Sequence, residues 1–160
     1  MVLALGPCGS GAAQAVDARI DALNASSDMV LVAAPASVAR ALEPAVWARA
    51  AYLVELAEGA SAADAWRAAL GEVLSRGRDA ALVTWLDGEP FTGATASAMV
   101  ARYAAAGGEV WAVEAASGGG KSVLLGRDMM ERLLRTTGWQ LAEEVLRANA
   151  AHVVTLTAAD

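Results

Sequence analysis

Short apolar runs alternate along the chain with longer segments in which apolar residues recur at helical spacing. The runs are too brief for buried helices and are rich in strand-forming residues, so they predict buried strands. Helical spacing is clearest behind Ser61, in a stripe made of Trp66, Ala69, Leu70, Val73 and Leu74. The predicted strands are Val2–Leu5, Met29–Ala33, Ala51–Val54, Ala80–Leu86, Glu109–Glu114, Ser122–Leu125 and Val153–Leu156.

Capping residues and proline mark where the intervening helices begin. Ser61 with Asp64, and Thr137 with Gln140, have the spacing of a capping box, and Thr92 is an N-cap candidate. The tryptophan and methionine residues fall on core positions of the predicted elements and are interpreted as packing residues. The predicted helices begin near Ala12, run from Ser37 to Leu42, begin at Pro44 and behind Ser61, run from Ala94 to Ala106, begin near Asp128, and run from Trp139 to Asn149.

Strands that alternate with helices predict an α/β fold of three α/β/α layers, with a mainly parallel, Rossmann-like sheet covered on both faces. Right-handed crossovers then bring the loops that follow the strands to one edge of the sheet. These loops are Gly6–Gly11, Pro35, Asp87–Gly93 and Ala116–Lys121. At 160 residues, the chain is expected to form a single domain that spans positions 1–160.

Composition excludes several classes of partner. A net charge of −6 and a pI near 4.7 argue against DNA or RNA as a ligand. No apolar stretch approaches the roughly 18 residues that span a bilayer, and the first residues lack the basic region of a signal peptide. We therefore expect a cytoplasmic protein with no membrane partner. The single cysteine, Cys8, excludes an intrachain disulfide, and the single histidine, His152, is expected at the surface.

The loop from Gly6 to Gly11 follows a predicted strand and opens a predicted helix. In this context glycines permit positive φ angles and let backbone N–H groups approach a phosphate. Gly6, Gly9, Ser10 and Gly11 are therefore candidate phosphate-binding residues. The alternative is a tight turn between strand and helix, because the loop lacks the full glycine spacing of nucleotide-binding motifs and no basic side chain follows it.

Two carboxylates, Asp87 and Glu89, follow the predicted strand Ala80–Leu86 in a turn that contains Gly88 and Pro90. Carboxylates at the carboxyl end of a parallel strand are well placed to hold Mg²⁺, which prefers oxygen ligands and usually also binds the phosphates of a nucleotide. The alternative is a solvated turn in which the aspartate bonds its own backbone.

The segment from Ser117 to Ser122 resembles the end of a phosphate-binding Walker loop. That motif requires a glycine five residues before Gly120, where Ala115 stands, and a helix from Lys121, where the sequence looks extended. We interpret the segment as a glycine-rich turn. Cys8 has no histidine nearby in the sequence to activate it as a nucleophile.

Three segments resemble the MobA-like nucleotidyltransferases, the family of molybdenum cofactor guanylyltransferases and cytidylyltransferases. Residues 57–61 (Ala-Glu-Gly-Ala-Ser) resemble the W-A-E-G-M-x-x-S-L motif of the family, residues 86–92 resemble L-x-D-Q-P-x-x-T, and residues 118–125 resemble G-x-x-G-H-P-V-L-F. The resemblance implies a nucleotide-diphospho-sugar transferase-like fold, Mg²⁺ on Asp87, and Glu58 and Gly59 among the cofactor-binding residues.

The departures from the family pattern concern the charged residues. The family's first loop carries an arginine and a lysine that bind the triphosphate, whereas here Gly9-Ser10-Gly11 runs into helix with neither. Asp87 stands one place earlier, relative to Pro90, than the family's metal-binding aspartate. Lys121 replaces the family's histidine, and it is a candidate to neutralise phosphate charge in catalysis.

Three functions are compatible with these observations. The favoured one is a catalytically degenerate MobA-like protein that acts as a binding or scaffold subunit and pairs with an active paralogue or with itself. The second is an active Mg²⁺-dependent nucleotidyltransferase that joins a nucleotide to a phosphorylated cofactor such as molybdopterin. The third is a small-ligand binder that uses the same cleft with an apolar mouth, to which Trp85 and Phe91 would contribute.

Overall fold

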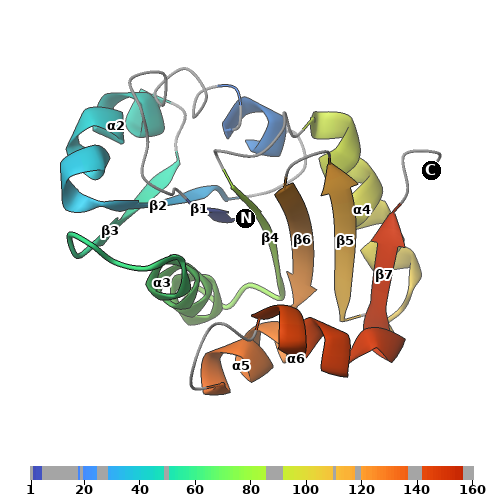
Figure 1. Ribbon diagram of the computed structural model, residues 1–160. Helices are drawn as coiled ribbons and strands as arrows, with labels where there is room; N and C mark the ends of the chain where they lie inside the picture. Colours follow the sequence, from blue (N-terminus) through green and yellow to red (C-terminus); the bar gives the residue numbers. More distant parts are fainter. Residues whose placement is uncertain are drawn as a thin grey trace.

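The computed structural model describes residues 2–4, 18, 20–24, 29–48, 51–85, 92–109, 111–117, 120–136 and 142–156. In this part of the chain, seven strands form one sheet in the order β3-β2-β1-β4-β6-β5-β7 (Figure 1). The strands are β1 (Val2–Ala4), β2 (Leu31–Pro35), β3 (Tyr52–Leu56), β4 (Ala80–Trp85), β5 (Ala112–Ser117), β6 (Gly120–Gly126) and β7 (Val153–Leu156).

The sheet is mainly parallel, as the alternation of strands and helices predicts. β1 pairs in parallel with β2 and β4, β2 with β3, and β5 with β7. β6 is the exception, because it runs antiparallel to both of its neighbours, β4 and β5. The reversal follows from the short connection between β5 and β6, which is too brief for the crossover that a parallel strand needs.

Helices cover both faces of the sheet and complete the three layers (Figure 1). Residues 20–24 are helical and, with α2 and α4, pack their apolar side chains on one face. α3, α5 and α6 cover the other face. No helix in the described ranges has the length and apolar content to cross a membrane. The helices with printed bounds are α2 (Ala36–Ala48), α3 (Ala62–Ser75), α4 (Gly93–Ala105), α5 (Arg127–Arg135), α6 (Ala142–Ala148) and the 3₁₀ turn η2 (Ala150–His152).

The predicted stripe on α3 is confirmed: Trp66, Ala69, Leu70 and Val73 are buried, and Leu74 packs at the margin of the same cluster. The capping box is also present. The Ser61 hydroxyl accepts from the Asp64 N–H, and the Asp64 carboxylate accepts from the Ser61 N–H. Both bonds supply partners that the first turn of a helix otherwise lacks.

Several predicted boundaries were wrong. The two helices expected on either side of Pro44 are one helix, α2, with this proline inside it. Proline removes one helical hydrogen bond, but Ala39, Leu42 and Val46 hold both halves against the same face of the sheet. β2 lies two residues later than predicted, because the apolar run continues through Ala34 into Pro35. The strand predicted at Glu109–Glu114 is β5, at Ala112–Ser117.

Other predictions fared differently. The Thr92 cap is confirmed, since its hydroxyl accepts from the Thr95 N–H at 3.1 Å. Within the helix predicted from Trp139 to Asn149, Leu146 is buried and Ala148 is exposed. The capping box of Thr137 and Gln140 lies outside the described residues. β6 already runs as a strand from Gly120, so no helix begins at Lys121. Gly118 and Gly119 of the predicted glycine-rich turn lie outside the described residues.

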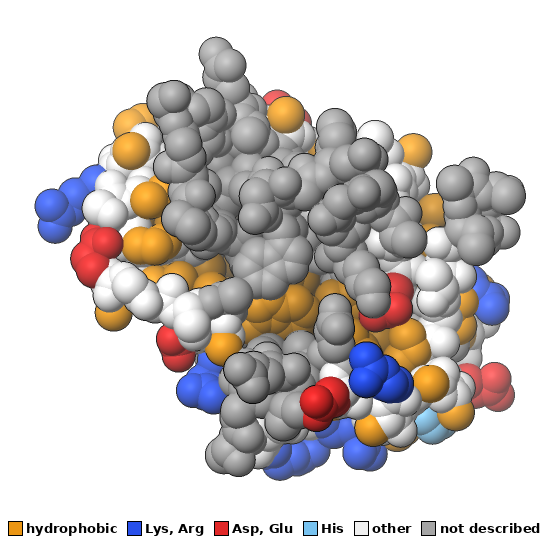
Figure 2. All heavy atoms as spheres, in the orientation of Figure 1, with side chains coloured by type: hydrophobic (Ala, Val, Ile, Leu, Met, Phe, Trp, Pro, Cys, Tyr) orange, Lys and Arg blue, Asp and Glu red, His pale blue; other side chains and the backbone are white. Residues whose placement is uncertain are grey.

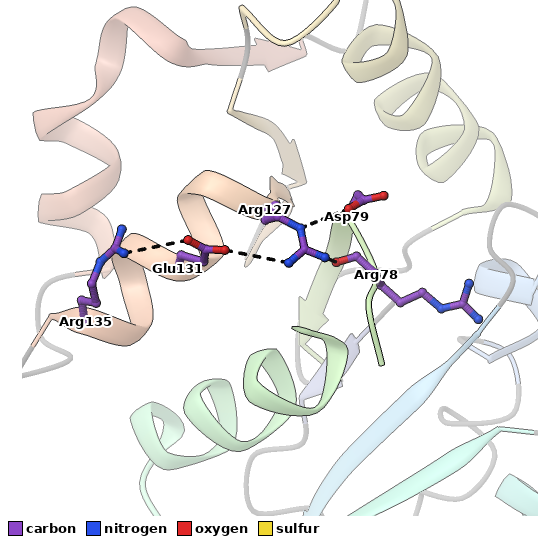
Figure 3. Close-up of polar contacts among 5 residues, drawn as sticks. All are labelled: Arg78, Asp79, Arg127, Glu131 and Arg135. Atoms are coloured by element: carbon purple, nitrogen blue, oxygen red, sulfur yellow. Dashed lines mark hydrogen bonds and ion pairs between the residues drawn. The ribbon is translucent and has the colours of Figure 1, made fainter. Parts of the chain in front are cut away.

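At the amino edge of the parallel strands, Arg127 ties α5 to the start of β4 (Figure 3). Its Nε lies 3.1 Å from Asp79 Oδ1, and its Nη2 donates to the Arg78 carbonyl at 3.2 Å. Glu131 lies 3.9 Å from both Arg127 and Arg135. Because these side chains are largely solvent-exposed, each ion pair contributes little, and the contact mainly orients α5.

His152 is half-buried rather than simply a surface residue. Its ring stacks on Trp111 with centroids 3.8 Å apart and planes at 11°, and its Nδ1 lies 3.0 Å from the Glu109 carbonyl. The guanidinium of Arg132 lies over Trp111, 4.5 Å from the ring centroid. These contacts attach the start of β7 to the α4–β5 connection and to α5.

Gly126, at the end of β6, lies directly under Tyr103 of α4. A Cβ added at this glycine would collide with the Tyr103 hydroxyl and would lie 3.0 Å from Cζ. We therefore expect Gly126→Ala to lower the free energy of unfolding by about 1–3 kcal/mol, through overpacking. Tyr103→Phe removes the hydroxyl and should restore part of the loss in the double variant. Urea denaturation of the three variants measures this, and equal stability of Gly126→Ala and the parent would contradict it.

Burial raises the pKa of the Tyr103 phenol, and the nearby carboxylates of Asp128 and Asp79 raise it further. The folded state therefore holds this proton at a pH where the unfolded chain has begun to lose it, near the ordinary value of about 10. The resulting stability is complete below that pH and is lost as the pH rises through the higher pKa of the folded state. Tyr103→Phe should make the decline in unfolding free energy above about pH 10 shallower. An unchanged slope in alkaline urea titrations would refute this assignment.

Candidate functional site

The carboxyl ends of the parallel strands lie at one edge of the sheet, where open α/β sheets bind ligands. β1 lies between β2 and β4, and Ala4 at its end pairs with Trp85 at the end of β4. Beside them, Pro35 at the end of β2 pairs with Leu56 at the end of β3. The segments that leave β1 and β4 at this edge are those that carry the glycines and carboxylates singled out in the sequence.

Those side chains themselves lie outside the described residues. They are Gly6, Gly9, Ser10 and Gly11 of the first loop, and Asp87 and Glu89 of the loop after β4. Their assigned roles therefore remain predictions. What the structure provides is the position of the two strands from which both loops depart, which are neighbours in the sheet.

Lys121 lies at the same edge because β6 is reversed. Its backbone pairs with Ala116 of β5, and the β4–β6 register, in which Val83 pairs with Val123, runs toward this edge. Continuing that register by two residues brings position 121 opposite the end of β4. The backbone of Lys121 therefore lies at the carboxyl edge, opposite the end of the strand from which the segment with Asp87 departs.

A buried pair of hydroxyls, which the sequence reasoning missed, lies just inside this edge. Thr84 and Ser122 are 2% and 4% exposed, and the Ser122 hydroxyl donates to Thr84 Oγ1 at 3.0 Å. The bond gives the Ser122 hydroxyl an acceptor and the Thr84 oxygen a donor, which offsets part of the cost of burying these polar groups. The available signal was a single polar residue in each of two otherwise apolar runs. The bond joins β4 to β6 one residue before β4 ends and one residue after Lys121.

Glu58, a predicted cofactor-binding residue, lies in the loop between β3 and α3 and contacts the start of α2. Its Oε1 accepts from the Ser37 N–H at 2.6 Å, and its Oε2 accepts from the Ser37 hydroxyl at 3.1 Å. Ser37, where a helix was predicted to begin, lies in the first turn of α2 and donates to a carboxylate 21 residues away. A carboxylate is favourable there because the N–H groups of the first turn are unpaired and carry partial positive charge.

The loop that carries Glu58 is held in one shape. Gly59 has a φ of 76°, which other residues rarely adopt, and open space lies where a side chain would stand. Ser61 then begins α3 with the capping box. Its hydroxyl first, and then its backbone N–H, lower the pKa of the Asp64 carboxyl through hydrogen bonds. The backbone at Gly59 is therefore open to an approaching ligand, between two fixed helix starts.

On the side of the molecule drawn in Figure 2, hydrophobic side chains gather near the centre, and acidic and basic side chains lie to one side of them. In the described ranges, no three His, Cys, Asp or Glu residues cluster closely enough to hold a metal ion.

A comparison with solved structures finds similar chains at high coverage and low identity. Rv0371c from Mycobacterium tuberculosis H37Rv, in a complex with manganese, matches 97% of this chain and 85% of its own, with a TM-score of 0.70 and 16% identity. A cytidylyltransferase from Leptospira borgpetersenii matches 97% and 73%, with a TM-score of 0.75 and 11% identity.

CMP:2-keto-3-deoxy-manno-octonic acid synthetase, complexed with CTP, matches 98% of this chain and 88% of its own, with a TM-score of 0.70 and 10% identity. At these identities the likeness shows the fold, which is that of the nucleotide-diphospho-sugar transferases. No family model matches the chain, and no curated protein matches it.

The contact between Glu58 and Ser37 predicts a loss of stability on substitution. Glu58→Ala leaves the start of α2 without its carboxylate and should lower the free energy of unfolding by about 1 kcal/mol. Glu58→Gln is the matched control, because its amide oxygen still accepts from the Ser37 N–H, and it should lose less. Urea denaturation measures both. Equal stability of Glu58→Ala and the parent would mean that this contact contributes nothing.

Proposed function

We propose that this chain binds a nucleotide with a divalent cation at the carboxyl edge of its sheet, and that its capacity for nucleotidyl transfer is impaired or lost. The observation that carries the proposal is the pairing of β1 with β4, which ends at Ala4 and Trp85. A phosphate-binding loop and a metal-binding loop must face each other, and neighbouring strands that end in register provide that relation. Proteins of similar fold have been solved with CTP and with manganese, which supports a site for a nucleotide and a divalent cation here.

The cation would be held by Asp87, with Glu89 beside it in sequence. Both supply hard carboxylate oxygens, which suit Mg²⁺ and leave further coordination positions for phosphate oxygens and water. When bound, such a cation neutralises phosphate charge and orients the reacting group. The backbone N–H groups around Gly6, Gly9, Ser10 and Gly11 would bind the phosphates from the opposite side.

Impairment follows from the charges of the first loop. From Leu5 to Ala18 the sequence contains no lysine or arginine. A triphosphate carries about four negative charges, and each missing charge-assisted hydrogen bond removes roughly 1.5–3 kcal/mol. Phosphoryl chemistry depends chiefly on positioning and electrostatic stabilisation, so transfer should suffer more than folding does.

An active MobA-like nucleotidyltransferase is the second candidate, and the position of Lys121 favours it. β6 brings this residue to the same edge, beside the end of β4. A lysine there would replace part of the charge that the first loop lacks. Such an enzyme would join a nucleotide to a phosphorylated acceptor of the molybdopterin kind.

Calorimetric titration tests nucleotide binding directly. GTP, CTP and ATP are each titrated with and without Mg²⁺ into the wild type, Asp87→Ala and the control Glu109→Gln, whose carboxylate is exposed at the opposite edge of the sheet. We expect one nucleotide to bind in a Mg²⁺-dependent manner, a loss of at least about tenfold in affinity for Asp87→Ala, and no change for Glu109→Gln. Binding that survives Asp87→Ala would overturn the metal assignment.

Release of pyrophosphate from the bound nucleotide distinguishes the two candidates. Impaired transfer predicts binding with no measurable turnover, and the substitution Ser10→Lys, which returns a cation to the first loop, should then tighten nucleotide binding. The active enzyme predicts turnover that Lys121→Ala abolishes while leaving the fold intact by circular dichroism. Absence of binding for all three nucleotides would refute both candidates.

A further inference from the structure

One edge of the sheet carries an open strand. β3 is the last strand in the sheet order and pairs with β2 alone among the strands that the structure describes (Figure 1). The Tyr52 N–H donates to the Val30 carbonyl at 2.8 Å, so residues 52, 54 and 56 direct their backbone groups toward β2. In a strand these directions alternate. The N–H and C=O groups of Leu53 and Glu55 therefore face outward, available to another strand.

This edge lacks most of the features that keep edge strands from pairing. Proteins usually protect such strands with lysine, proline, a bulge or an unusually short length. β3 is five residues long and contains one charged residue, Glu55, and no proline. Tyr52, at its start, is 46% exposed.

The helix beside the edge is also unusual on its outer side. Trp47 of α2 is 68% exposed, which contradicts the expectation that every tryptophan packs in the core. With Ala39, Leu42 and Val46 against the sheet, the helical period places Ala36, Arg40, Glu43 and Trp47 on one flank. A right-handed β2–α2–β3 connection turns this flank toward the open edge. Neither Arg40 nor Glu43 forms an ion pair with any residue in the described ranges.

We propose that a second copy of this chain binds here, with β3 pairing antiparallel to β3 of the other copy about a two-fold axis at Val54. Leu53 then lies opposite Glu55 of the partner copy, and both residues have their backbone groups directed across the interface. This is the hydrogen-bonded type of antiparallel pair. Val54 lies opposite its own symmetry mate in the non-hydrogen-bonded position. This interface does not depend on the proposed nucleotide site.

Charge and side-chain pairing select this register. An axis at Glu55 would place two glutamates directly opposite each other, which is unfavourable. The axis at Val54 instead places Tyr52 opposite Leu56 of the other copy, on the face that Val54 also occupies. Aromatic and aliphatic pairs of this kind stabilise neighbouring strands. The Arg76 guanidinium already lies 4.2 Å from the centroid of the Tyr52 ring, which is still 46% exposed, so the partner strand would cover the remaining exposed surface of the ring.

The helices meet in the same arrangement. α2 contacts both β2 and β3, so its axis lies roughly one strand spacing, about 4.8 Å, from the two-fold axis. The two copies of α2 would thus lie about 10 Å apart and antiparallel, within the usual distance for packed helices. In this arrangement the facing helix of the other copy would bury Trp47, and Arg40 would lie near Glu43 of the other copy. Arg40 and Glu43, which form no ion pair within the part of the chain that the structure describes, would complement each other across the axis.

The first experiment measures the mass of the full chain in solution by light scattering over a range of concentrations. We expect a dimer for the wild type. Glu55→Pro removes an outward N–H without touching the β2 ladder and should weaken dimerisation about ten- to a hundred-fold. Glu55→Gln keeps the N–H and should remain dimeric. Trp47→Ala, which leaves the strand unchanged, should also weaken the dimer. It provides the test of the interface if Glu55→Pro fails to fold.

Thr155→Pro is the matched change at the other edge of the sheet. The Gly126 N–H donates to the Trp111 carbonyl, so Ala112 and Glu114 of β5 face β7, and Thr155 of β7 faces outward. This variant should stay dimeric. A wild type that is monomeric at every concentration, or dissociation by Thr155→Pro and not by Glu55→Pro, would overturn the proposal.

Cross-linking tests the register itself. In a Cys8→Ser background, Val54→Cys places two thiols opposite each other in a non-hydrogen-bonded pair, where the Cα separation of about 4.5 Å suits a disulfide. Mild oxidation should give a covalent dimer. Leu53→Cys is the control, because its symmetry mate lies across from Glu55, and it should cross-link far more slowly. Equal cross-linking of the two variants would refute the axis at Val54.

Discussion

The reversed strand β6 is the constraint on which the rest of the structure depends. Because it runs against both β4 and β5, it begins at the carboxyl edge and ends at the amino edge. Its start places the backbone of Lys121 opposite the end of β4. Its end places Gly126 under Tyr103, where α5 begins and Arg127 contacts Asp79. The buried bond between Ser122 and Thr84 fixes the register of this strand. A shift by one residue would separate these hydroxyls and turn the apolar residues of β6 to the wrong faces.

Much of the architecture could be predicted because it depends on local pattern. Continuous apolar runs mark the buried strands, and Ser61 and Thr92 cap helices through bonds to residues three positions on, which a sequence displays directly. Predictions failed where packing outweighed a local signal. Pro44 in the sequence predicts the start of a helix. In the structure Leu42 and Val46 are both buried against the same face of the sheet, and α2 continues through Pro44. Trp47 reads as a core residue, but its angular position on α2 turns it outward.

The candidate site was predictable in outline and not in detail. Strand order decides which loops become neighbours, and the pairing of Ala4 with Trp85 agrees with the edge that right-handed crossovers predict. Contacts between segments far apart in the chain produce no recognisable pattern in the sequence. Nothing near Ser37 in sequence identifies Glu58 as its partner, and nothing in β4 or β6 alone couples Thr84 to Ser122. Such contacts follow from the topology and could be found only after it was known.

The first turn of α2 obtains one of its hydrogen-bond acceptors, the carboxylate of Glu58, from a segment 21 residues further along the chain. Helix caps are usually local, so that a helix start can form as soon as its own residues are present. Here the Ser37 amide acquires its acceptor only once β3 has docked on β2 and the following turn has closed over Gly59. The exchange rate of that single amide proton therefore reports on the docking of β3. It provides a spectroscopic probe of the sheet's outer edge at a residue that is not part of that edge.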